Sequence, residues 1–103
     1  MRIPASIQIG GHTIKIEYQS GLVAYQEAYG VFDPTQLRIL IDKDLSSSVK
    51  LETFWHEVVE ALNFFAEAEM DHSKIQIFGV LLHQVSQSLE GGPNVNRKKE
   101  RGG

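Results

Sequence analysis

The first half of the chain alternates between apolar and polar residues, a pattern typical of half-buried β-strands. Residues 7–18 form two such runs, and the glycine pair at positions 10–11 between them is typical of a tight hairpin turn. Alternation returns in residues 27–41, on either side of an Asp-Pro-Thr-Gln turn signal. The pattern therefore predicts two β-hairpins. Residues 19–26 between them fit either an irregular connection or a further short strand.

The second half of the chain has the 3.6-residue period of amphipathic helices. One helix is expected at residues 47–69, after serines that can cap it, and a second is expected to run from a cap in the Asp-His-Ser segment at positions 71–73 to the glycine at position 91. The apolar stripe of the second helix is predicted to pack on the first helix. This stripe consists of Ile75, Phe78, Leu82, Val85 and Leu89.

These elements predict the fold class. Four strands that are apolar on one face need a cover, and two amphipathic helices can supply it. We therefore predict a two-layer α+β fold, in which a small antiparallel sheet of two hairpins is covered by a C-terminal helical hairpin. The length of 103 residues suits one small domain, expected at residues 1–90. Residues 91–103 open with two helix terminators and are expected to form a disordered basic tail.

Charge is divided unevenly between these two parts. Residues 1–90 hold 6 basic and 12 acidic side chains, a net charge of −6, whereas the tail carries +3. This argues against nucleic-acid binding by the body and leaves only a weak contact through the tail. The chain has no cysteine, no apolar leader and no apolar run long enough to span a membrane, so we expect a cytoplasmic protein without membrane contact.

One pattern in the chain points to chemistry, the sequence His-Glu-Val-Val-Glu at positions 56–60. His56 and Glu60 are four residues apart, so their side chains leave one helix face with Cβ atoms about 5 to 6 Å apart and can chelate one metal ion. Glu57 lies about 100° further round the helix, where its carboxylate can reach a metal-bound water molecule without ligating the metal. This is the spacing of the HEXXH zinc helix with glutamate as the last residue, an HEXXE motif. A solvated polar helix face is the alternative interpretation.

The motif and the order of elements together resemble small phage and prophage proteins of the zincin-like metallopeptidase type. The resemblance covers residues 3–89 and includes the Gly-Gly hairpin, the Leu-Arg-Ile-Leu-Ile-Asp strand and the Leu-His-Gln-Val segment of the second helix. It implies a zincin-like fold, zinc as cofactor and a peptide or protein substrate, in the host cytoplasm if the chain is phage-encoded. It also implies that His56 is a metal ligand and Glu57 the catalytic base, with Glu60 at the position of the second ligand.

A third metal ligand has to come from outside the motif. If the helical hairpin folds back at residue 71 or 72, position 60 lies opposite position 83, which makes His83 the predicted ligand. His72 in the turn is about 15 Å along the axis from Glu60 and is not expected to reach it. The sequence pattern does not determine whether His12 lies near the site.

Two functional hypotheses follow. In the first, the chain is a zinc-dependent metallopeptidase-like amide hydrolase whose Glu57 deprotonates a water molecule for attack on a carbonyl group. In the second, the chain is a non-catalytic interaction protein on a zincin-like scaffold. It would bind a phage or host protein through its acidic surface or an exposed strand edge.

Overall fold

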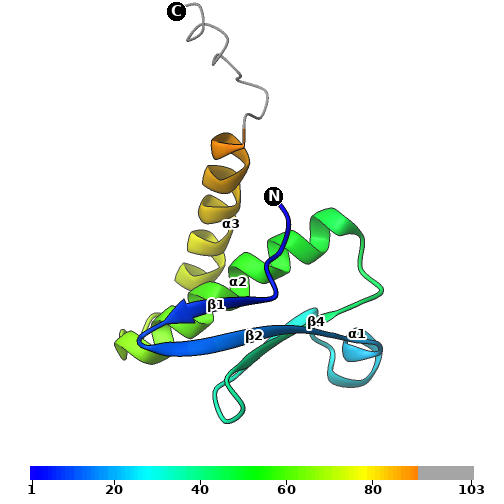
Figure 1. The fold of residues 1–103 in the computed structure, drawn as a ribbon, viewed down its shortest axis with the longest axis horizontal. Coiled ribbons are helices and arrows are strands. Elements are labelled where there is room, and N and C mark those ends of the chain that lie inside the picture. The colour runs from blue at the N-terminus through cyan, green and yellow to red at the C-terminus, as the bar shows by residue number, and fades with distance from the viewer. Residues whose placement is uncertain (91–103) are drawn as a thin grey trace, which may run out of the picture.

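The computed structural model of the chain describes residues 1–90, and the tail expected at residues 91–103 lies outside the described residues. Two strands, a short helix, two further strands and two long helices follow one another along the chain (Figure 1). Their bounds are β1 Ser6–Ile9, β2 His12–Gln19, α1 Leu22–Gln26, β3 Gly30–Asp33, β4 Arg38–Asp42, α2 Ser47–Ala66 and α3 His72–Leu89. The predicted α+β fold with two β-hairpins and a C-terminal helical hairpin is confirmed.

Each β-hairpin is closed by the turn chemistry that its sequence contains. Gly10 and Gly11 have φ angles of 60° and 82°, the two left-handed residues that a type I′ turn requires. In the second hairpin, the Oδ1 atom of Asp33 accepts hydrogen bonds from the backbone amides of Thr35 and Gln36 at 3.0 and 3.2 Å.

The sheet is mixed, and in this detail the prediction of an antiparallel sheet is wrong. Its strand order is β1-β2-β4-β3, and the two hairpins meet along a parallel pairing of β2 with β4, with Ile16 opposite Ile39. Each hairpin thereby places its more apolar second strand at the centre of the sheet, where Ile14 and Ile41 are fully buried. The less buried first strands, β1 and β3, form the two edges.

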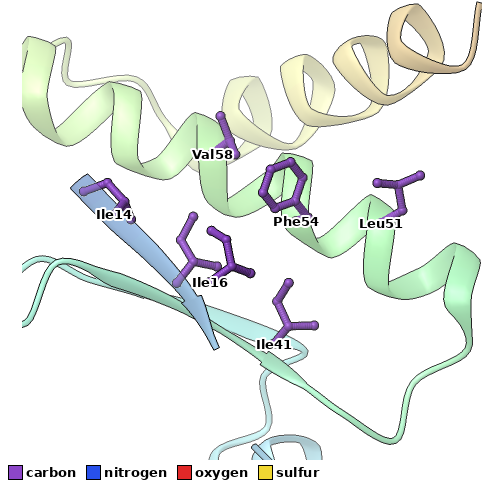
Figure 2. Packing of buried hydrophobic residues seen from close by; sticks show 7 residues of the cluster. Ile14, Ile16, Ile41, Leu51, Phe54 and Val58 are labelled. Atoms are coloured by element: carbon purple, nitrogen blue, oxygen red, sulfur yellow. The ribbon is translucent and has the colours of Figure 1, made fainter. Parts of the chain in front are cut away.

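The hydrophobic core lies between the sheet and one face of α2. Figure 2 shows Leu51, Phe54 and Val58 of α2 facing the isoleucines of β2 and β4. Helix α2 begins at an N-cap, because the side chain of Ser46 accepts a hydrogen bond from the backbone amide of Val49. The position of α2 is therefore fixed by burial against the sheet.

The segment that the sequence left ambiguous forms the short helix α1. Its first turn is held by the buried Asp42 at the end of β4, whose Oδ2 atom accepts a hydrogen bond from the backbone amide of Val23 at 2.9 Å. The backbone amide of Asp44 donates to the other carboxylate oxygen. These hydrogen bonds lower the pKa of Asp42, so its carboxylate joins α1, β4 and the turn toward α2 at neutral pH.

Helix α3 packs on α2 with only part of the predicted stripe. The residues of α3 that are buried are Ile75, Gly79 and Ser86. Phe78 and Val85 of the predicted stripe are about half exposed instead. In Figure 1, α3 crosses α2 and extends away from the sheet. Within residues 1–90, no helix combines the length and apolar character needed to cross a membrane.

Candidate metal centre

The motif residues His56 and Glu60 lie one turn apart on α2, on the side away from the core. The Nε2 atom of His56 is 3.5 Å from the Oε2 atom of Glu60, a contact that is an ion pair when the imidazole is protonated. Both side chains are partly buried. The predicted convergence of these two residues is therefore present in the structure.

A third potential ligand, His72, comes from the first residue of α3. Its imidazole ring lies 5.5 Å from that of His56, measured between ring centroids. One ligand atom from each of His56, Glu60 and His72 can be chosen so that all three lie within 4.8 Å of one another. In residues 1–90 this is the one group of histidine and carboxylate side chains with the spacing to hold a metal ion.

The N-cap of α3 fixes the backbone at His72, whose side chain is exposed. The side chain of Asp71 accepts hydrogen bonds from the backbone amide of Lys74 at 3.0 Å and from the hydroxyl group of Ser73 at 2.7 Å. These hydrogen bonds lower the pKa of Asp71, so the carboxylate cap is present at neutral pH. The residue next to the cap is thereby fixed at the start of the helix.

Gly79 brings α3 close enough to α2 for His72 to reach the motif. A Cβ atom at this position would lie 3.0 Å from the Cα atom of His56 and 3.3 Å from its backbone nitrogen. Only a residue without a side chain allows the two backbones to approach so closely. The helices therefore cross at His56, beside the candidate ligands.

His83, the predicted third ligand, does not join the group. It does not line the cleft described below, and its buried Nε2 atom has no hydrogen-bond partner within residues 1–90. The expectation that His72 cannot reach Glu60 is also wrong. Both errors concern the path of α3 along α2, which depends on where the chain turns and on how the two helices cross.

The chain turns earlier than the sequence pattern suggests. Helix α2 ends at Ala66, three residues before its predicted end, because Glu67 adopts a left-handed conformation with a φ angle of 51°. The amide of Met70 then donates a hydrogen bond to the side-chain oxygen of Asn63 at 2.9 Å, which folds the loop back on the helix. The early turn and the crossing of the two helices at Gly79 together place His72, and not His83, beside the motif.

Glu57 lies on the core side of the site and is only 6% exposed. Burial and the nearby carboxylate of Glu60 raise its pKa from 4.5 to about 7, although a hydrogen bond with the backbone of Phe32 acts in the opposite direction. The side chain packs against β3, where a Cβ atom on Gly30 would lie 3.3 Å from the Cγ atom of Glu57. Glu57 is therefore a buried carboxyl group whose pKa is close to neutral pH.

These residues line one cleft of about 690 Å³. Its walls are the segment from Glu27 to Phe32, which includes most of edge strand β3, the middle of α2, and the first turns of α3. His56, Glu57, Glu60 and His72 all contribute to its lining. The cleft thus combines a candidate metal centre, a carboxyl group of raised pKa and a strand edge.

The donor set could hold a metal ion. Two histidines and one glutamate form one of the ligand sets of catalytic zinc, which keeps its fourth position open for water or substrate. Donor atoms of one tetrahedral zinc site lie roughly 3 to 3.5 Å apart. The pair His56 and Glu60 already meets this spacing at 3.5 Å, and His72 needs a small side-chain adjustment to meet it.

Sequence reasoning missed His72, although two signals pointed to it. The Asp71 cap indicates that His72 starts a helix, and Gly79 within an otherwise apolar helix indicates a close approach to another backbone. Together they predict that the start of α3 lies near α2.

Comparison with known proteins gives no relative for this chain. No protein family matches its sequence, and no curated protein or solved structure is significantly similar to it. Its function therefore has to be argued from the site.

Proposed function

We propose that this chain is a zinc-dependent, metallopeptidase-like amide hydrolase in which His56, Glu60 and His72 bind the metal ion and Glu57 is the general base. The observation that supports it most is the convergence of two histidines and a glutamate beside a buried carboxyl group in one cleft. The resemblance to zincin-like phage and prophage proteins supports the same chemistry. On that resemblance, the chain acts in the cytoplasm, that of the host if it is phage-encoded.

Zinc and Glu57 would have separate roles in the proposed hydrolysis. A zinc ion in the site would acidify a water molecule and polarise the substrate carbonyl group. Glu57 would take the proton of that water and pass it to the leaving amine, a role for which a pKa of about 7 is well matched near neutral pH. Positive charge beside Glu57 would lower this pKa, so the carboxylate would be ready to accept the proton.

The strand edge in the cleft favours a peptide as the substrate. Strand β3 pairs only with β4 in the described part of the chain, so its outer edge offers backbone groups along the cleft that no other strand pairs, although the backbone of Phe32 hydrogen-bonds to Glu57. An extended peptide can add to such an edge through main-chain hydrogen bonds. This edge equally supports the second candidate function, a non-catalytic protein that binds a peptide segment of a phage or host protein.

Metal binding is the first test. Protein purified without a histidine tag should bind about one equivalent of zinc in isothermal titration calorimetry. His72→Ala should reduce the affinity at least about tenfold, whereas the matched control His83→Ala should leave it unchanged. Binding below about 0.1 equivalent, or equal affinities of the two variants, would contradict the proposed site.

Catalysis is the second test, and it separates the two candidate functions. Zinc-loaded protein should cleave members of a peptide library, and Glu57→Gln should abolish cleavage while zinc binding persists. Peptide binding that Glu57→Gln leaves intact, with no cleavage by the zinc-loaded wild type, would favour the non-catalytic protein.

A further inference from the structure

One face of α3 is apolar and uncovered. Five large hydrophobic residues of this helix are 47 to 80% exposed, namely Ile77, Phe78, Leu81, Val85 and Leu89. They lie on a side of α3 that differs from the α2-facing side, which is formed by Ile75, Gly79 and Ser86. We name this set of five residues the α3 apolar face.

The α3 apolar face is also free of charge. No charged residue occurs between positions 75 and 89, whereas residues 1–90 as a whole carry a net charge of −6. Exposed helices usually carry charged residues on their solvent side. Two copies of such an acidic body repel each other least when they meet through a surface that carries no charge. The α3 apolar face provides that surface.

We infer that two copies of this chain pair through their α3 apolar faces. The contact would be isologous, with the same face of each copy packed on the other around a two-fold axis. Phe78, Leu81 and Val85 follow the i, i+3, i+7 spacing by which paired helices pack their seams. A second copy therefore matches this face in polarity, in charge and in the spacing of its side chains.

The exposed area is consistent with this pairing. Five half-exposed large side chains leave roughly 500 Å² of apolar surface, which is near the upper end of what monomeric proteins expose as one patch. Covering it on two copies would bury about 1,000 Å², the lower range of specific interfaces. We therefore expect a dimer that dissociates on dilution.

Pairing through this face leaves the candidate metal centre accessible. The α3 residues that line the cleft are His72 and Gln76, and neither belongs to the α3 apolar face. Dimerisation and metal binding are therefore separate properties of α3, and either can be tested without the other.

Sedimentation velocity of the full chain over a concentration series tests the inference. The wild type should approach twice the chain mass of 11.6 kDa as its concentration rises. Leu81→Glu should remain a monomer, because it places two like charges in the seam. Gln87→Glu, the same charge change on the opposite side of α3, should dimerise as the wild type does. Circular dichroism should show that both variants are folded.

Two outcomes would overturn the inference. One is a wild type that stays a monomer up to about 1 mM or forms open-ended assemblies. The other is equal dimerisation of Leu81→Glu and Gln87→Glu. If Leu81→Glu does not fold, cysteine cross-linking replaces it, since the chain has no cysteine of its own. On mild oxidation, Leu81→Cys should give a covalent dimer and Gln87→Cys should not; equal yields would again overturn the inference.

Discussion

Helices α2 and α3 carry apolar stripes of similar length, yet the structure covers them differently. The stripe of α2 packs against the sheet, where Phe54 is 2% exposed. The stripe of α3 leaves Phe78 47% exposed, because α3 meets α2 through the small residues Gly79 and Ser86. Periodicity thus shows that a helix has an apolar face but does not show what covers it. Small residues on the adjacent side decided which face of α3 approaches α2.

The same difference explains where the candidate metal centre lies. Helix α2 is fixed by its burial in the core and presents His56 and Glu60 from a rigid position. Helix α3 contributes only His72, and its position depends on the close crossing at Gly79. The site therefore joins a firmly held helix to one that is held mainly along one side.

The largest expected effect is a loss of stability that differs between the apolar stripes of α2 and α3. Phe54→Ala should lower the free energy of unfolding by about 3 to 5 kcal/mol, because it opens a cavity in a packed core. Phe78→Ala should lower it by less than about 1 kcal/mol, because the side chain is half exposed. Urea unfolding at concentrations where the chain is monomeric measures both. Equal losses would show that α3 buries its stripe as α2 does.

The next effect concerns Glu57, the ionisable group that α2 buries. Its raised folded-state pKa means that the unfolded chain ionises first as the pH rises, so stability is lost between about pH 4.5 and 7. The loss amounts to at most about 3 kcal/mol. Glu57→Gln should match the wild type at pH 4 and exceed it at pH 8 in urea unfolding, and zinc should reduce this excess by lowering the pKa of Glu57.

A stability difference between wild type and Glu57→Gln that does not change with pH would contradict this prediction. Because the other ionisable groups are common to both proteins, the difference isolates the contribution of Glu57.

The fold was largely predictable because its signals are local. The glycine pair at positions 10–11, the turn at Asp33 and the two helix caps each act within a few residues. The structure has the caps at Ser46 and Asp71, within the segments where the sequence predicted a cap. The parallel pairing of β2 with β4 was not predictable in this way. It depends on how two separate hairpins are arranged against α2, which no local pattern specifies.

The site was predictable only within one helix. The spacing of His56 and Glu60 follows from helical geometry and is found in the structure. The third member of the group depended on where the chain turns, and the left-handed conformation of Glu67 shifted that turn by a few residues. That shift alone does not exchange histidines eleven positions apart, and the crossing of α3 over α2 at Gly79 is also needed; together they explain why His83 was predicted and His72 was found.

A smaller effect is expected at the helix crossing. Gly79→Val should destabilise the fold by about 2 kcal/mol, because its side chain would meet the backbone of His56 and push α3 away. The same displacement should weaken zinc binding about tenfold or more, since His72 moves with α3. Calorimetric titration and urea unfolding measure both effects. Val80→Ala, at the exposed neighbouring position, is the control and should change neither quantity appreciably.

The smallest expected effect compares the N-caps of the two helices. Ser46→Ala and Asp71→Ala each remove a side chain that accepts a hydrogen bond from the first turn, so each should lower the melting temperature by a few degrees. The two variants should differ in their affinity for zinc, because only Asp71 fixes the neighbouring residue His72 at the start of α3. Asp71→Ala should therefore weaken zinc binding in calorimetric titration, while Ser46→Ala leaves the affinity unchanged. If both variants bind zinc as the wild type does, His72 does not need the cap to reach the site. In that case α3 is held firmly enough by its contact with α2 alone, and the contrast between the two helices is smaller than their burial suggests.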